Sequence, residues 1–205
     1  GFRIAMRDME IRGAGNLLGP EQSGYMMSVG YDMYLKLLND AVLEQQGKQA
    51  EITPECAADL TVSAFIPERY VPAAEQRMDL YRRIAAIRTD ADAAELTDEL
   101  LDRFGDVPAA VKALLDVALL RAAAARAGIC DITQRGRQLV FSFGPQPDIA
   151  AVAAVCGMAC YRQRLQLSAT SQPKLTLYLQ PDEEALSAAG KLVEELALRH
   201  TEEKT

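Results

Sequence analysis

The sequence lacks an initiator methionine, a secretory leader and any long apolar stretch. It opens on Gly1-Phe2-Arg3-Ile4, inside an apolar run typical of a strand, so we expect a piece cut from a longer protein. No stretch approaches the roughly 20 apolar residues of a membrane span, and we expect a cytoplasmic chain without a membrane partner. Hydrophobic residues make up 49% and charged residues 25% of the chain, as in ordinary folded proteins.

A basic excess is also missing, since the net charge is −7. Residues 1–50 contain five Lys or Arg against six Asp or Glu, and the rest contains seventeen against twenty-three. Proteins that grip the DNA backbone need a basic surface, because phosphate neutralisation supplies most of their affinity. We therefore expect the second part of the chain to bind proteins rather than DNA.

Histidine and paired cysteines are equally scarce. The four cysteines form no CxxC pair, and the only histidine is His200. Cys156 and Cys160 lie four residues apart in an apolar run, but a zinc site would need further ligands nearby, so the pattern favours free thiols in a reducing compartment. A freestanding enzyme would need converging acid, base or nucleophilic groups, and none is evident. We predict no catalytic residue, metal or cofactor for this chain.

The amino-terminal part combines a loop and a helix. An apolar segment turning polar at 2–12 precedes a glycine-rich loop at 13–24, and apolar residues at three and four spacing predict a helix over about 26–46. Polar residues around position 48 mark the best boundary. We predict two domains, 1–48 and 49–205.

The second part predicts an α+β fold with a small mixed or antiparallel sheet and helices packed on it. The expected elements are a strand at 60–66, a helix opened by Pro72, a helix at 89–104 with Thr89 and Asp92 as capping box, a helix from Pro108 to 128, strands at 129–134 and 138–143 joined by a turn at Arg135-Gly136, a helix at 147–158, strands at 161–167 and 174–179, and a helix at 182–199.

The densest pattern is Arg-Asp-Met-Glu-Ile-Arg-Gly-Ala-Gly-Asn-Leu-Leu-Gly at residues 7–19, followed by Glu-Gln-Ser-Gly at 21–24. Arg12 offers a planar fork for a carboxylate or phosphate, and Gln22 can donate and accept. Both stand among glycines that allow backbone turns, namely Gly13, Gly15, Gly19 and Gly24. The loop is either a surface turn with ordinary helix caps or a hinge that transmits movement. It matches neither a P-loop nor a dinucleotide fingerprint.

This motif resembles the one shared by RecG-type branch-migration helicases and Mfd-type transcription-repair coupling factors, with Met9 where the family usually has Leu. Ala14 and Asn16 are similar to the Mfd version, whereas RecG-type proteins more often have Pro and Glu. The continuation, including Pro-Glu-Arg-Tyr-Val-Pro at 67–72 and Leu-Leu-Asp-Arg-Phe-Gly at 100–105, resembles the Mfd carboxy-terminal domain.

The resemblance implies a role in transcription-coupled DNA repair. In the family the motif couples ATP hydrolysis to movement along double-stranded DNA, and the matching positions here are Arg12, Gln22 and, less directly, Arg7. ATP and Mg²⁺ would bind only in the motor lobes of the full-length parent, which displaces stalled RNA polymerase and recruits UvrA. The carboxy-terminal domain would autoinhibit by packing on the UvrB-like amino-terminal module, whose UvrA-binding surface it hides. The motor lobes would be a further intramolecular partner of the chain.

The expected helix at 89–104 is strongly acidic on its outer side, where Arg103 is the only base. The acidic residues are Asp92, Glu95, Asp98, Glu99 and Asp102. They form either a solvated face that aids solubility or an electrostatic dock for a basic patch on the UvrB-like module. Glu99, Asp102 and Arg103 are the predicted partner-binding residues. An adaptor domain unrelated to a motor, or part of a RecG-type helicase, remains an alternative.

Overall fold

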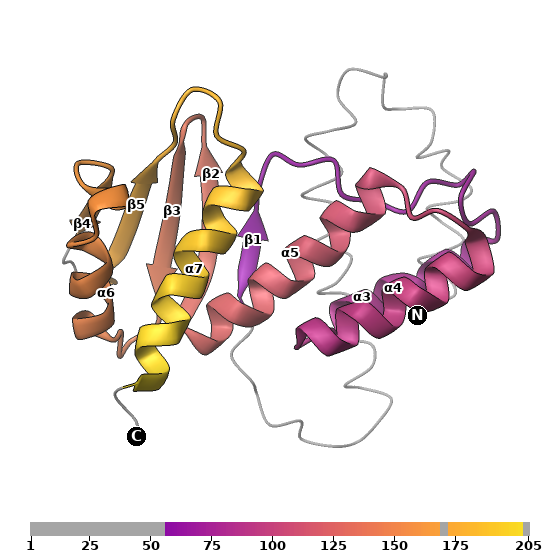
Figure 1. Cartoon of the computed structure of the whole chain (residues 1–205), viewed down its shortest axis with the longest axis horizontal. Helices are drawn as coiled ribbons and strands as arrows, with labels where there is room; N and C mark the ends of the chain where they lie inside the picture. Colours follow the sequence, from indigo (N-terminus) through magenta and orange to yellow (C-terminus); the bar gives the residue numbers. More distant parts are fainter. Residues whose placement is uncertain (1–55, 169–171, 203–205) are drawn as a thin grey trace, which may run out of the picture.

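The computed structural model describes residues 56–168 and 172–202, which form five α-helices and one five-stranded mixed sheet (Figure 1). This architecture confirms the predicted α+β class. The segments predicted at 2–12, 13–24 and 26–46 lie outside the described residues, and the domain boundary near residue 48 stays a prediction.

The sheet has the strand order β1-β2-β3-β5-β4. Its strands are β1 (Ala57–Asp59), β2 (Ile129–Arg135), β3 (Gln138–Phe143), β4 (Leu165–Ser168) and β5 (Lys174–Tyr178). β1 pairs with β2 in parallel, and every other pair is antiparallel. Because a parallel pair needs a long crossover, the three helices between β1 and β2 fill that connection.

Those three helices are α3 (Ala74–Ala85), α4 (Asp90–Phe104) and α5 (Ala109–Arg126), and α6 (Ile149–Cys156) and α7 (Ala185–Glu202) follow later. Pro108 is the N-cap of α5 with φ of −61°, and Gly105 ends α4 with φ of +78°, a backbone conformation that suits glycine. None of the helices in the described part of the chain is long and apolar enough to cross a membrane.

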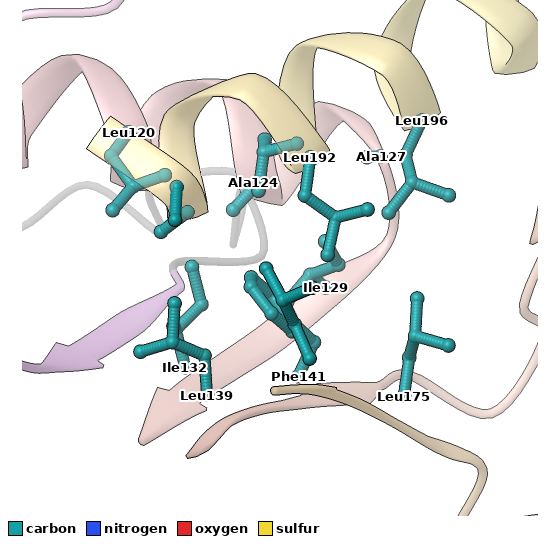
Figure 2. Packing of buried hydrophobic residues seen from close by; sticks show 14 of the residues in the cluster. Leu120, Ala124, Ala127, Ile129, Ile132, Leu139, Phe141, Leu175, Leu192 and Leu196 are labelled. Carbon is teal, nitrogen blue, oxygen red and sulfur yellow. The ribbon is translucent and has the colours of Figure 1, made fainter. Parts of the chain in front are cut away.

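Two hydrophobic clusters hold the described residues together. The sheet core contains the inward side chains of β2, β3 and β5 and the buried faces of α6, α7 and the second half of α5. Figure 2 shows Leu192 of α7 lying over Phe141, with Ala124 of α5 on one side of it and Leu196 of α7, above Leu175, on the other. Each such fully buried side chain contributes about 1.5–3 kcal/mol of transfer free energy.

The helical core joins α3, α4 and the first half of α5. Ile84 of α3, Leu100 of α4 and Leu114 of α5 meet there, and none of the three is more than 1% exposed. Since α5 places one half in each core, it connects the sheet to the α3–α4 pair (Figure 1). The position of α4 on the molecule therefore depends on the packing of α5.

The strand predicted at 60–66 is wrong. The chain leaves the sheet after Asp59, and residues 60–66 have no strand partner among the described residues. Their alternation has another cause: Leu60 is buried in the sheet core and Ile66 in the helical core. The backbone turns locally, with the amide of Val62 donating to the carbonyl of Leu60 at 2.9 Å. This segment crosses between the cores, so its apolar side chains contact both.

Smaller differences arise at turns. The β2–β3 hairpin forms as predicted, but its turn lies at residues 136–137, one residue later, with Gly136 at φ of +59°. β4 begins at Leu165 rather than at 161, because Tyr161 belongs to a short 3-10 turn (η1, Ala159–Tyr161) and is buried in the sheet core.

Candidate protein-interaction site

Helix α4 begins with the predicted capping box. The hydroxyl of Thr89 accepts a hydrogen bond from the amide of Asp92 at 3.2 Å, and the Asp92 carboxylate accepts from the amides of Thr89 and Arg88 at 2.9 and 3.0 Å. These bonds, that from the Arg88 amide first, lower the pKa of Asp92. Asp92 is therefore committed to the helix start and is a poor candidate for contact with a partner.

Three other carboxylates of α4 point to solvent. Glu95, Asp98 and Asp102 are exposed, and within residues 56–168 and 172–202 none of them makes a hydrogen bond or salt bridge. Their spacing of three and four residues places them along one side of the helix. They form an acidic stripe, the name used below for Glu95, Asp98 and Asp102, which is available to a basic surface.

Glu99 lies beside the stripe and is already paired. Arg83 of α3 binds it through two parallel contacts, Nη1 to Oε1 at 2.8 Å and Nη2 to Oε2 at 2.5 Å, and Arg103 Nη1 approaches Oε1 at 2.6 Å. These contacts, Arg83 first, lower the pKa of Glu99 to about 2, and the bond to Glu99 raises the pKa of Arg83. The sequence offers no signal for Arg83 as partner, because it lies sixteen residues from Glu99 on another helix.

The last turn of α4 is fixed by an aromatic cluster. The Arg103 guanidinium lies 5.0 Å from the centroid of the Phe104 ring, which is 5.7 Å from the Tyr70 ring. The Tyr70 hydroxyl lies 3.2 Å from the carbonyl oxygens of both Leu100 and Gly105 and donates to them. Through these contacts residues 67–72 hold the end of α4, where Asp102 and Arg103 stand.

Leu101 adds an apolar group to the same surface. Its side chain is 50% exposed, although the neighbouring Leu100 is only 1% exposed. Leu101 is three residues from Asp98 and next to Asp102, so the surface offers one large apolar contact among carboxylates. The spacing of Leu96, Leu100 and Phe104 predicts Leu100 on the inward side, as the structure confirms, but sequence reasoning did not single out Leu101 as a contact for a partner.

A second feature is an open groove of about 640 Å³ over α5, between α7 and the α3–α4 junction. Its charged lining residues are four cations and four anions: Arg88, Lys112, Arg126, Lys191, Asp90, Asp116, Glu184 and Glu194. Burial raises the pKa of Asp116, and the nearby Glu184 raises it further. Because the opposite charges are equal in number, the groove presents no net charge to a ligand.

The surface of α4 contains only part of the predicted residues that the structure describes. Arg7, Arg12, Gln22 and the four loop glycines lie outside the described residues. In the part of the chain that the structure describes, no group of three or more His, Cys, Asp or Glu is arranged to hold a metal ion. No disulfide joins any two of the four cysteines, all of which the structure describes; they range from buried Cys56 to exposed Cys160, and burial raises the pKa of Cys156.

Comparison with known proteins identifies related chains. Residues 60–153 match the family model of the TRCF domain. The chain is 38% identical over 144 residues to the transcription-repair-coupling factor of Staphylococcus haemolyticus, covering 69% of this chain and 12% of that protein. It is 36% identical over 148 residues to that of Staphylococcus epidermidis, covering 71% and 13%, and 40% identical over 139 residues to that of Staphylococcus aureus, covering 67% and 12%.

The fold also resembles a solved structure, the crystal structure of the C-terminal domain of a transcription-repair coupling factor. The TM-score is 0.61 at 20% identity, with 74% of this chain and 98% of that chain covered. The matched regions make up only 12–13% of the length of the full relatives. The comparison thus concerns a small part of much longer proteins.

Proposed function

This chain carries the TRCF domain of the transcription-repair coupling factors, and we propose that it supplies the regulatory and translocation-coupling end of an ATP-dependent translocase on double-stranded DNA. In this proposal ATP and Mg²⁺ bind to motor lobes of the parent protein that lie outside the chain. The parent displaces stalled RNA polymerase in the cytoplasm and recruits UvrA. The chain itself regulates the parent translocase and transmits the movement of its motor lobes, and it catalyses no reaction of its own.

Regulation resides in the surface of α4. The acidic stripe docks on a basic patch of the UvrB-like module, and this contact hides the module's UvrA-binding surface until RNA polymerase is engaged. The observation that carries the proposal is the set of three exposed carboxylates that make no hydrogen bond or salt bridge within the described residues, beside the exposed Leu101. Charged contacts of this kind give specificity and fast association more than affinity, which suits an interface that must open.

Asp102→Lys in the full-length parent tests the docking role. Asp102 has no ion pair within the described residues, so its reversal leaves the fold intact while repelling a basic patch. We expect UvrA binding and basal ATPase activity to rise. The matched control is Asp182→Lys, since Asp182 is an exposed acid before α7, outside α4.

Glu99→Lys does not test docking alone, although the sequence suggests that it would. It would place an ammonium group between Arg83 and Arg103, so a loss of masking could come from damage to the α3–α4 pair. If Asp102→Lys binds UvrA as weakly as the parent does, the docking surface is not the acidic stripe.

Translocation coupling is proposed for the amino-terminal motif, on the resemblance of residues 7–24 alone. Arg12 and Gln22 transmit nucleotide-dependent movement of the motor lobes to the DNA, and Arg7 assists. Arg12→Ala in the full-length protein should leave DNA binding and ATP hydrolysis largely intact while stopping displacement of a triplex or of stalled polymerase. Normal displacement by that variant would refute the coupling role.

A further inference from the structure

We propose that Arg103 is an internal competitor of the docking partner: it occupies Glu99 while the domain is released, and it yields that carboxylate to a partner guanidinium when the domain docks. This inference rests on the proposed docking of α4 and names the regulation of that surface. It changes the role of two predicted residues. Glu99 becomes a shared acceptor and Arg103 the group that leaves it.

The Glu99 carboxylate is already occupied by two guanidinium groups. Glu99 Oε1 accepts from both Arg83 Nη1 at 2.8 Å and Arg103 Nη1 at 2.6 Å, whereas Oε2 accepts, among the residues that the structure describes, only from Arg83 Nη2 at 2.5 Å. An ionised carboxylate has about four lone-pair sites, two on each oxygen. Oε1 is therefore filled and Oε2 keeps one site. An incoming guanidinium that binds both oxygens must displace a resident group.

Arg103, rather than Arg83, is the resident group that leaves. Arg83 reaches Glu99 from another helix through two parallel contacts, the strong arrangement for this pair of groups. Arg103 makes one contact from the same helix, four residues away, and its side chain is 45% exposed. Exposed pairs of this spacing are weak. A displaced Arg103 also keeps its place over the Phe104 ring, 5.0 Å from the centroid, so its release leaves no buried charge.

The group of the partner that binds Glu99 is an arginine guanidinium. The exchange replaces one guanidinium by another, so Glu99 is neutralised both in the docked and in the released domain. A partner arginine can match both oxygens, whereas a lysine ammonium cannot replace the planar fork. Asp98 and Asp102, which make no salt bridge within the described part of the chain, then receive further cations of the same patch. Because the released domain already satisfies Glu99, docking gains little from this carboxylate, and the contact stays reversible.

The experiment measures binding of the full 205-residue chain to the separately purified UvrB-like module of its parent, by calorimetry and by dissociation rate. Arg103→Gln removes the competitor, and we expect dissociation about twofold slower, the factor that corresponds to loss of one exposed i, i+4 pair. The control is Arg82→Gln, which removes an equal charge from an exposed position on α3. General attraction to a basic partner would respond equally to both variants, mainly through the association rate.

The same comparison in a Glu99→Gln chain distinguishes the exchange of guanidinium groups on Glu99 from general attraction between charges. In the Glu99→Gln chain the carboxylate is absent, so Arg103→Gln should no longer slow dissociation. An effect of Arg103→Gln that equals that of Arg82→Gln, or persists in the Glu99→Gln background, overturns the exchange while leaving docking in place. Complete failure of the unmodified chain to bind the module refutes the proposed docking and this inference with it.

Discussion

Two adjacent leucines provide a test of which face α4 presents to solvent. Leu100 is 1% exposed and packs in the helical core with Ile84 and Leu114, whereas Leu101 is 50% exposed. Leu100→Ala leaves a cavity in a packed core, for which the expected loss is about 3 kcal/mol of unfolding free energy. For a chain of this size that corresponds to a melting temperature lower by roughly 6–12 °C.

Leu101→Ala makes the same chemical change one residue later. Because the side chain is half in solvent and the site has no packed cavity to leave, the free energy of unfolding should change by no more than about 0.5 kcal/mol. Urea and thermal unfolding of the full chain, followed by circular dichroism, measure both variants. In the binding assay, Leu101→Ala should weaken docking, since it removes the one large apolar contact of the surface.

A similar loss of stability in both variants would refute the reasoning. Successive residues of a helix are separated by roughly 100° about its axis, so Leu100 and Leu101 cannot both face the same core equally. Equal destabilisation would mean that α4 is rotated from the orientation described, and the acidic stripe would then not be the exposed side. The docking proposal would lose its structural basis.

Three further outcomes are expected. Arg83→Gln should raise the pKa of Glu99 from about 2 toward its ordinary value of 4.5, as measured by NMR titration of the carboxyl carbon. The stability that the Arg83–Glu99 pair contributes is present above pH 4.5 and is lost as the pH falls toward 2. An unchanged pKa of Glu99 in the variant would contradict the assigned cause. Asp116→Asn should stabilise the chain slightly at neutral pH, since the raised pKa of Asp116 signifies a penalty on its charged form; the gain should vanish below the unfolded pKa of about 3.9, and a gain that persists there would point to another cause. Thr89→Ala should cost about 1 kcal/mol in urea unfolding through loss of the α4 cap, and no change would mean that Asp92 alone satisfies the helix start.

Local signals in the sequence predicted much of the fold. The capping box of Thr89 and Asp92, the stop at Gly105 and the hairpin between β2 and β3 depend on residues close together in the chain, and each formed. The strand prediction for residues 60–66 failed because the alternating apolar residues of this segment are buried in two different cores. A strand needs a hydrogen-bonding neighbour, and the residues of a single segment do not reveal one.

The candidate site was predictable only in outline. The acidic side of α4 follows from helical spacing, and Asp102 is exposed as expected. The spacing of Leu96 and Leu100 likewise places Leu100 rather than Leu101 in the core, whereas the occupation of Glu99 by Arg83 depends on the packing of α3 against α4. Tertiary contacts therefore decided which acidic side chains are still available to a partner.

A charge-swap rescue between the chain and the UvrB-like module tests the central claim most directly. The account predicts that Asp102→Lys weakens binding of the 205-residue chain to the module, and that an arginine-to-glutamate substitution on the module's basic patch restores binding to Asp102→Lys while weakening binding to the unmodified chain. Equal affinity of the module for Asp102→Lys and for the unmodified chain would contradict the claim that α4 is the docking surface.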